Sequence, residues 1–277
     1  MSARPIKDLS KLCIHTITHK PWTIEQSARK FSEAGVGGIT VWRDAIAGKD
    51  IRATAEMLRS MNLEVVSLCR GGFFPSLTKE GRAAAIEENK KAIDEASALG
   101  APMLVLVCGS APGQSLEESR NQIKQGIEAC LPYAIEKGVT LTIEPLHPMY
   151  AGDRSAINTL AQANDLAEYF NSDNVGIAVD VYHVWWDPDL QNQIKRCAAN
   201  GNLSAFHVCD WKTPTLDMLN DRGIMGEGCI NLKENRGWVE EAGFNGFNEV
   251  EIFSNIYWKQ DQDGYFDRII AGYLEHT

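Results

Sequence analysis

The chain has 277 residues, of which 44% are hydrophobic and 23% are charged, and this composition is typical of a globular protein rather than a disordered one. Its net charge of −10 argues against nucleic acid and against an anionic membrane surface as binding partners. No stretch is long and apolar enough to span a bilayer, and the first residues hold no apolar signal region. Seven cysteines without a Cys-x-x-Cys pair indicate buried, reduced thiols, so we expect a cytoplasmic protein.

Segments typical of strands and helices alternate along the chain. Apolar runs predict strands at 12–17, 38–42, 64–69, 103–107, 141–144, 175–180, 203–207 and 247–251. Helical segments follow them at about 23–34, 50–61, 79–99, 115–137, 158–170, 187–200, 231–242 and 265–274. Thr23 with Gln26 has the pattern of a capping box at a helix start. Five of the helices stop at a glycine just before the next strand, namely Gly35, Gly100, Gly138, Gly201 and Gly243.

Strict alternation of strand and helix implies parallel strands joined by crossover helices. Eight such units in 277 residues fit a closed barrel better than an open sheet. No segment rich in proline or serine interrupts the pattern as a linker would. We therefore predict an α/β fold in which residues 1–277 form a single (β/α)8 TIM barrel domain.

Polar side chains stand at the ends of the last four predicted strands, at Glu144, Asp180, His207 and Glu251. The C-terminal ends of the strands form the functional face of such a barrel, so these side chains should meet in one mouth. Three carboxylates packed there would repel one another and lose hydration, and a divalent cation removes both costs. One nitrogen and three carboxylates suit Mn²⁺, Mg²⁺, Co²⁺ or Zn²⁺ better than a soft metal. Unrelated helix-capping residues are the alternative, and four consecutive strand ends argue against it.

The motifs in this half of the chain carry a resemblance. They are Ile143-Glu144-Pro145, Val179-Asp180-Val181-Tyr182-His183, Phe206-His207-Val208-Cys209-Asp210, Asp221-Arg222 followed by Gly226-Glu227-Gly228, and Val250-Glu251-Ile252-Phe253. In order and spacing the chain resembles the xylose-isomerase-like TIM-barrel superfamily, the branch of sugar phosphate isomerases/epimerases. That branch includes ketose 3-epimerases, hydroxypyruvate isomerase and inosose dehydratase.

The resemblance implies a ligand set and an activity. It implies that Glu144, Asp180, His207 and Glu251 bind one divalent metal ion, with Mn²⁺ the favoured ion. It also implies that His183 and Arg222 hold substrate oxygens. The expected activity is isomerisation or epimerisation of a keto sugar or related polyol, by proton abstraction next to a metal-polarised carbonyl. Glu144 and Glu251 would then exchange the proton from opposite faces of the substrate.

The segment after the metal-binding Glu144 departs from the ketose epimerases. These enzymes usually carry a further acidic residue there, whereas this chain has His147, a potential additional acid/base because histidine titrates near neutral pH. A histidine would suit a lyase on the same scaffold, either an inosose-type dehydratase or an enzyme that cleaves a 3-keto-glycoside. An abasic-site endonuclease of the related barrel family is a third reading, and the net charge of −10 and only six histidines argue against it.

The expected partner is a small-molecule sugar or cyclitol. Trp186 is an expected contact for the sugar, because an aromatic ring near a strand end can stack on a sugar face. Arg70 and Arg154 are candidates to bind a phosphate or carboxylate, but no glycine-rich phosphate cradle appears, which favours a free sugar. Neither a nucleic acid nor a membrane is expected as a partner, and the sequence does not decide whether the chain forms a homo-oligomer.

Overall fold

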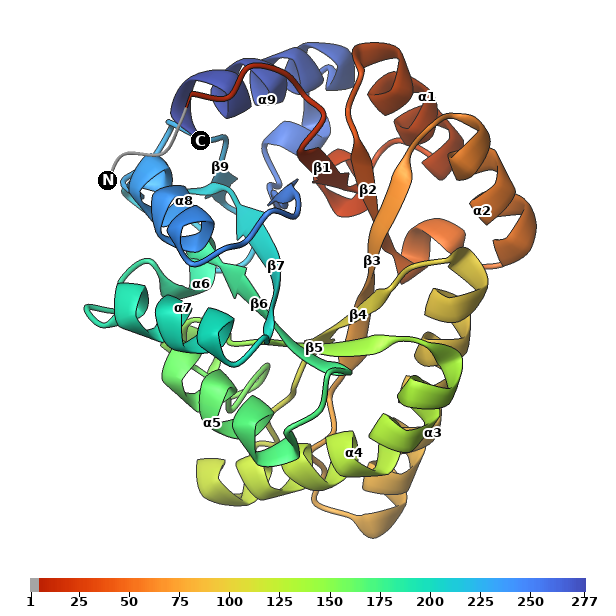
Figure 1. The fold of residues 1–277 in the computed structure, drawn as a ribbon, viewed down its shortest axis with the longest axis vertical. Coiled ribbons are helices and arrows are strands. Elements are labelled where there is room, and N and C mark those ends of the chain that lie inside the picture. Colours follow the sequence, from red (N-terminus) through yellow and green to blue (C-terminus); the bar gives the residue numbers. More distant parts are fainter. Residues whose placement is uncertain (1–4) are drawn as a thin grey trace.

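A computed structural model describes residues 5–277 and shows a closed barrel of eight parallel strands surrounded by helices (Figure 1). Around the barrel the strands follow the order β1-β10-β7-β6-β5-β4-β3-β2. Their bounds are Leu12–His15 (β1), Gly38–Trp42 (β2), Glu64–Gly72 (β3), Met103–Val107 (β4), Thr140–Glu144 (β5), Val175–Asp180 (β6), Leu203–Val208 (β7) and Asn248–Val250 (β10). The predicted fold class is confirmed.

The main helices form the outer layer, and their ends follow the capping residues of the sequence. They span Ile24–Ala34 (α1), Ile51–Ser60 (α2), Lys79–Leu99 (α3), Leu116–Lys137 (α4), Leu160–Phe170 (α5), Leu190–Ala199 (α7), Leu232–Glu241 (α8) and Gln262–His276 (α9). Thr23 and Gln26 form the expected capping box of α1. Gly100 ends α3 in the left-handed conformation, with φ of 80°, which a residue with a Cβ atom rarely adopts.

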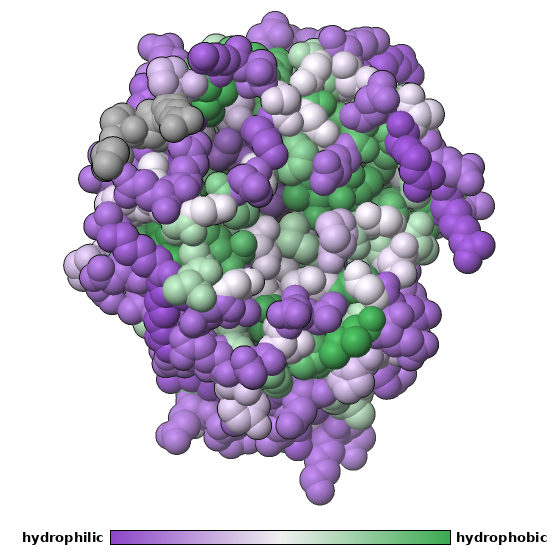
Figure 2. Space-filling view, viewed as in Figure 1, coloured by the Kyte–Doolittle hydropathy of each residue, from purple (hydrophilic) through white to green (hydrophobic). Residues whose placement is uncertain are grey.

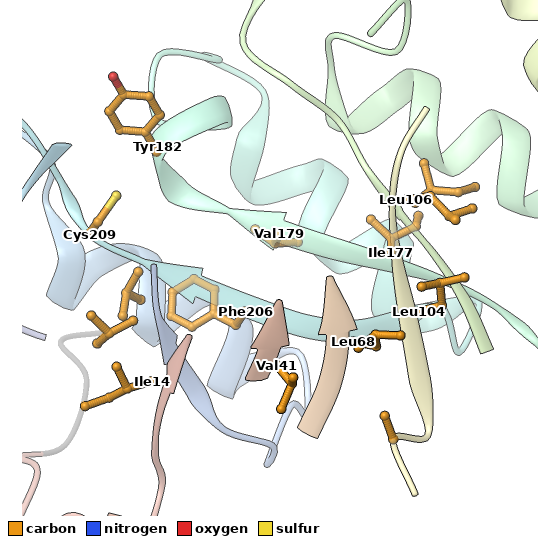
Figure 3. Packing of buried hydrophobic residues seen from close by; sticks show 14 of the residues in the cluster. Ile14, Val41, Leu68, Leu104, Leu106, Ile177, Val179, Tyr182, Phe206 and Cys209 are labelled. Atoms are coloured by element: carbon orange, nitrogen blue, oxygen red, sulfur yellow. The ribbon is translucent and has the colours of Figure 1, made fainter. Parts of the chain in front are cut away.

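Side chains on each strand alternate between two environments. One set points toward the helices and forms the apolar core, with Ile14, Val41 and Val179 among its members (Figure 3). The other set fills the inside of the barrel and is largely polar, with buried residues such as Thr40 and Ser67. Hydrophilic residues cover the outer rim of the molecule (Figure 2). The sheet thus separates an apolar layer from a polar interior that leads to the site.

Short elements at the C-terminal ends of the strands complete the functional face. They are the helix α6 (Val181–Val184), the antiparallel hairpin of β8 (Asp210–Trp211) and β9 (Arg222–Gly223), and four 3₁₀ turns (Thr16–His19, Arg43–Ile46, Pro148–Tyr150 and Tyr257–Lys259). None of them was predicted. The eighth barrel strand also ends at Val250, so Glu251 lies just after it, and the Glu251 N–H donates to the Val208 carbonyl at 3.2 Å.

The structure bears on two expectations from the composition, namely those on membrane-spanning segments and on the cysteines. Within residues 5–277, no helix has the length and apolar character needed to cross a membrane. The thiols of all cysteines but Cys229 are buried, and none is in a disulfide. The cytoplasmic location stays a prediction.

Candidate functional site

The four strand-end residues converge at the C-terminal mouth of the barrel. Glu144 ends β5, Asp180 ends β6, His207 lies in β7, and Glu251 follows β10. Each offers one ligand atom, and these atoms all lie within 4.8 Å of one another. All four side chains are buried. The barrel therefore forms a compact cluster of one imidazole and three carboxylates.

The donor atoms of this cluster fit a divalent cation. Glu144 Oε1 and His207 Nδ1 lie 3.0 Å apart as a buried ion pair, and neither atom has a hydrogen-bond partner elsewhere among the described residues. A divalent ion would take the place of the imidazole proton between these two donor atoms. Carboxylate oxygens with one imidazole match the preferences of Mn²⁺ and related ions. The role of the four residues as metal ligands stays a prediction.

Arg222 adds a permanent positive charge to the cluster. Its Nη1 lies 3.0 Å from Asp180 Oδ2 and 2.8 Å from Glu251 Oε2, and its Nη2 lies 3.2 Å from His183 Nε2. The side chain is 2% exposed. Its Nε is buried without a hydrogen-bond partner among residues 5–277, so this N–H is available to a substrate oxygen.

The loop that carries Arg222 is fixed by Asp210. The Asp210 carboxylate accepts hydrogen bonds from the backbone N–H groups of Gly226, Gly228 and Ile230, at 2.9 to 3.0 Å. These bonds fold the segment after β7 back over the barrel and pair β8 with β9. A charge-assisted network of this kind holds a loop rigidly, which gives Arg222 a defined position.

Two further buried residues, His15 and Glu249, lie beside the cluster, and Glu249 was not predicted as a site residue. His15 Nδ1 lies 2.9 Å from Glu251 Oε1, and His15 Nε2 lies 3.2 Å from Glu249 Oε2. Glu249 Oε2 also accepts a hydrogen bond from the Thr40 hydroxyl at 2.7 Å. Glu249 and Glu251 are two residues apart along extended backbone, so their side chains point to the same, inner face of the barrel. This spacing is the sequence signal that could have identified Glu249.

The carboxylates control the protonation of both histidines. Burial alone would lower the pKa of His207, but Glu249 and Glu144 outweigh it and raise that pKa to about 9. Burial would also lower the pKa of His15, but Glu251 and Glu249 outweigh this effect and raise that pKa to about 9. In the metal-free protein at neutral pH both imidazoles are therefore protonated.

This protonation predicts that metal affinity depends on pH. His207 must lose its proton before it can bind an ion. Below its pKa of about 9, each further unit of pH decrease therefore weakens the apparent metal affinity about tenfold. We expect the apparent Kd for Mn²⁺ to fall about tenfold from pH 7 to pH 8, with release of at least about one proton per ion bound. Calorimetric titration in two buffers of different ionisation enthalpy measures both. An affinity that does not change between pH 7 and pH 8 would contradict the assignment of His207.

A cavity of about 190 Å³ opens onto the cluster. Glu144 and Glu251 line it, whereas Asp180 and His207 are not among its lining residues. The remaining wall is formed by Trp42, Cys69, Arg70, Val105, Val107, Leu146, Tyr150, Arg154, His183, Leu219, Arg222 and Phe253. A larger hollow of about 660 Å³ lies away from this site, against α8 and residues 5–8. The cavity at the C-terminal ends of the strands is the one that reaches the cluster, as the fold leads one to expect.

The other predicted residues occupy different positions. His183 and Arg222 line the cavity. His147 does not line it. Its ring packs between Trp186 and Trp211, with ring centroids 5.7 and 5.1 Å away, and its Nδ1 accepts a hydrogen bond from the Met149 N–H at 3.2 Å. Trp186 is also outside the lining and donates its Nε1–H to the His183 carbonyl. The aromatic rings that do face the cavity belong to Trp42, Tyr150 and Phe253.

Comparison with known proteins agrees with this fold. A family model described as "Xylose isomerase-like TIM barrel" matches residues 28–268. An inosose isomerase of Bacillus velezensis is 25% identical over 209 residues, which are 74% of this chain and 72% of that protein.

Two solved structures show the same architecture. A protein of Sinorhizobium meliloti 1021 is 44% identical, with a TM-score of 0.92 over 96% of this chain and 98% of that one. The IolI protein, whose crystal structure contains a zinc atom, is 20% identical, with a TM-score of 0.80 over 96% of this chain and 97% of that one. At that identity the second likeness shows the fold alone.

Proposed function

Because the chain belongs to the xylose isomerase-like TIM barrel family, we propose that it is a divalent-metal-dependent isomerase or epimerase of a small keto sugar or keto cyclitol. The observation that carries this proposal is the division of the cluster. Glu144 and Glu251 line the cavity, while Asp180 and His207 belong to the same cluster without lining it. The relatives named inosose isomerase, an activity on a keto cyclitol by that name, support the substrate class.

The four cluster residues would hold the ion, with Mn²⁺ the favoured one. When bound, a divalent cation polarises the substrate carbonyl and makes the neighbouring C–H group more acidic. Glu144 and Glu251 come from β5 and from the end of β10, strands that are not neighbours in the barrel. In the proposed reaction one of the two carboxylates removes a proton from one side of the substrate carbon and the other returns a proton from the opposite side.

The remaining wall residues bind and shield the substrate. Arg222 offers its unpaired Nε–H to a substrate oxygen. His183 lies beside it, and burial together with the positive charge of Arg222 holds the His183 pKa well below its usual range, so the imidazole is neutral at neutral pH. Trp42 and Phe253 pack edge to face, with ring centroids 5.2 Å apart, and form an apolar wall that limits access of water.

The lyase alternative receives less support from the geometry. It relied on His147 as an additional acid/base, and that side chain lies outside the cavity lining. Burial lowers its pKa, and its Nδ1 already accepts a backbone hydrogen bond. We therefore favour proton transfer without loss of a leaving group, and His147 as a packing residue beside Trp211.

The proposal predicts a product with the composition of its substrate. Metal-free protein reloaded with Mn²⁺ is incubated in D₂O with a panel of ketoses and keto cyclitols, and products are read by mass spectrometry and NMR. We expect an isomer that carries deuterium at one carbon, because the exchanged proton comes from solvent, and no conversion after treatment with a chelator. A product lighter by water or by a leaving group would instead show a lyase. Full activity in chelator-treated protein that contains no metal would refute the metal site.

A further inference from the structure

Two arginines of the cavity wall have no acidic partner among residues 5–277. Arg70 belongs to β3 and Arg154 to the loop after β5, and both line the cavity that reaches Glu144 and Glu251. Neither guanidinium forms a hydrogen bond or an ion pair with any side chain among residues 5–277. Arginines in a protein wall usually pair with carboxylates or phosphates, so two unpaired ones in a single cavity need an explanation.

Charge balance shows that these two arginines are in excess. The carboxylates of Glu144, Asp180 and Glu251 bring three negative charges, and a divalent ion together with Arg222 brings three positive ones. A further buried carboxylate beside the cluster, that of Glu249, is paired with His15. The charges of Arg70 and Arg154 are thus left uncompensated when the ion is bound.

The two charges also act on each other, and aromatic rings hold them in place. Burial and the positive charge of Arg154 lower the pKa of Arg70. The Arg70 guanidinium lies 4.3 Å from the centroid of the Phe73 ring, and the Arg154 guanidinium lies 5.9 Å from that of Tyr150. Ring contacts of this kind orient a guanidinium without neutralising it. A bound oxyanion would relieve the repulsion between the two cations.

We propose that Arg70 and Arg154 form an anion subsite, and that the substrate is a small keto sugar or keto polyol bearing a carboxylate or phosphate. This deepens the proposed function and rests on it for the position of the carbonyl at the metal cluster. In the barrel order β3, the strand of Arg70, lies opposite β7, the strand of His207, so Arg70 stands across the barrel mouth from a predicted metal ligand. The earlier expectation of a neutral sugar relied on a missing glycine-rich cradle, and two guanidinium groups bind an oxyanion without one.

The test uses three probes that differ only at carbon 6. D-fructose carries a hydroxyl there, D-fructuronate a carboxylate, and D-fructose 6-phosphate a phosphate. Binding to the Mn²⁺-loaded full chain is measured by calorimetry, which does not require turnover. We expect at least one anionic probe to bind about 10- to 100-fold more tightly than D-fructose, as for hydrogen bonds to a charged group. Whichever of the two anionic probes binds more tightly shows whether the subsite prefers a carboxylate or a phosphate.

Variants locate the effect. Arg154→Gln is expected to remove about tenfold or more of the preference for the anion over D-fructose, and Arg154→Lys should retain part of it. Arg70→Gln should act in the same way, and Arg154→Gln keeps the test valid if a change within β3 impairs folding. Arg43→Gln is the matched control, because Arg43 is paired with Glu88 and Glu95 outside the cavity lining, and it should leave the preference intact.

Each outcome bears on one proposal only. If D-fructose binds as tightly as both anions, or if Arg154→Gln weakens all three probes equally, the anion subsite is refuted, even where a neutral sugar is turned over. If the anionic probes bind preferentially and lose that preference in the arginine variants, the subsite stands, even where no keto substrate exchanges a proton and the proposed isomerase activity fails.

Discussion

Replacement of Glu251 by glutamine is expected to abolish exchange of the substrate hydrogen with solvent. The side chain lines the cavity and belongs to the cluster, and glutamine keeps its size and one oxygen ligand while removing the group that holds a proton. Loss of a general acid or base usually costs about 10²- to 10⁴-fold in rate. We expect a loss of this size in deuterium incorporation from D₂O at saturating Mn²⁺, and a similar loss for Glu144→Gln.

Asp180→Asn is the matched control for this experiment. Asp180 belongs to the same cluster and makes an ion pair with Arg222, as Glu251 does, but it does not line the cavity. The asparagine variant should therefore bind Mn²⁺ more weakly and recover exchange once the ion is saturating. Bound metal is measured by elemental analysis in each purified variant, so that loss of the ion is separated from loss of the proton carrier.

Two results would contradict these roles. Exchange that persists in both glutamate variants would remove Glu144 and Glu251 from the reaction, and the polar groups left on the cavity wall would have to be tested. Equal loss of exchange in Asp180→Asn and Glu251→Gln at saturating metal would show that the cluster acts only as a metal site. The carboxylates that line the cavity would then have no role distinct from that of Asp180.

Local patterns predicted most of the barrel because its elements are bounded by local chemistry. The strands at 38–42, 103–107 and 175–180 have the predicted bounds, and each is a short apolar run that follows a turn. The strand of Glu251 ends one residue earlier than predicted, because its pairing with β1 and β7 stops at Val250. The order of polar strand ends also brought the cluster together as expected, since parallel strands in a barrel open at one face.

Contacts that depend on barrel closure could not be predicted in this way. His15 reaches Glu249 and Glu251 only because β1 pairs with β10, at the greatest separation along the chain. The sequence pattern within either strand does not indicate how β1 and β10 are aligned with each other. His147 shows the opposite case, since it is close to Glu144 in sequence but does not line the cavity. The turn Pro148–Tyr150 begins at His147, and the ring packs against Trp211 instead.

Arg222 shows how far a resemblance could go for this site. The motif implied a contact with substrate oxygens, and the structure places the side chain on the cavity wall. The same guanidinium also bridges Asp180 and Glu251 at 3.0 and 2.8 Å, which no spacing in the sequence indicated. Its position depends on a hairpin at residues 210–223, formed by a long loop that folds back over the strands. A residue expected only to hold substrate therefore also balances charge inside the protein.

This second role predicts that Arg222→Met strongly destabilises the metal-free protein. Removing one partner of a buried ion pair leaves an uncompensated charge, which typically costs about 3–5 kcal/mol. For a domain of this size, the loss corresponds to a fall in Tm of roughly 6–20 °C. The matched control is Arg196→Met, because Arg196 also pairs with two carboxylates, Asp165 and Glu168, but is 33% exposed. A surface pair of that kind is worth about 0–1 kcal/mol, so its Tm should move little.

Mn²⁺ should restore much of the stability that Arg222→Met removes. A bound ion would supply positive charge to Asp180 and Glu251 in place of the missing guanidinium, and the guanidinium would no longer repel it. We therefore expect saturating Mn²⁺ to raise the Tm of Arg222→Met more than that of the unmodified protein, whereas His207→Ala, which removes a predicted ligand, should show little response. Thermal unfolding with and without the ion, followed by circular dichroism, measures both differences. If Arg222→Met failed to respond to Mn²⁺ while His207→Ala responded fully, Arg222 would be required for metal binding and His207 would not be a ligand.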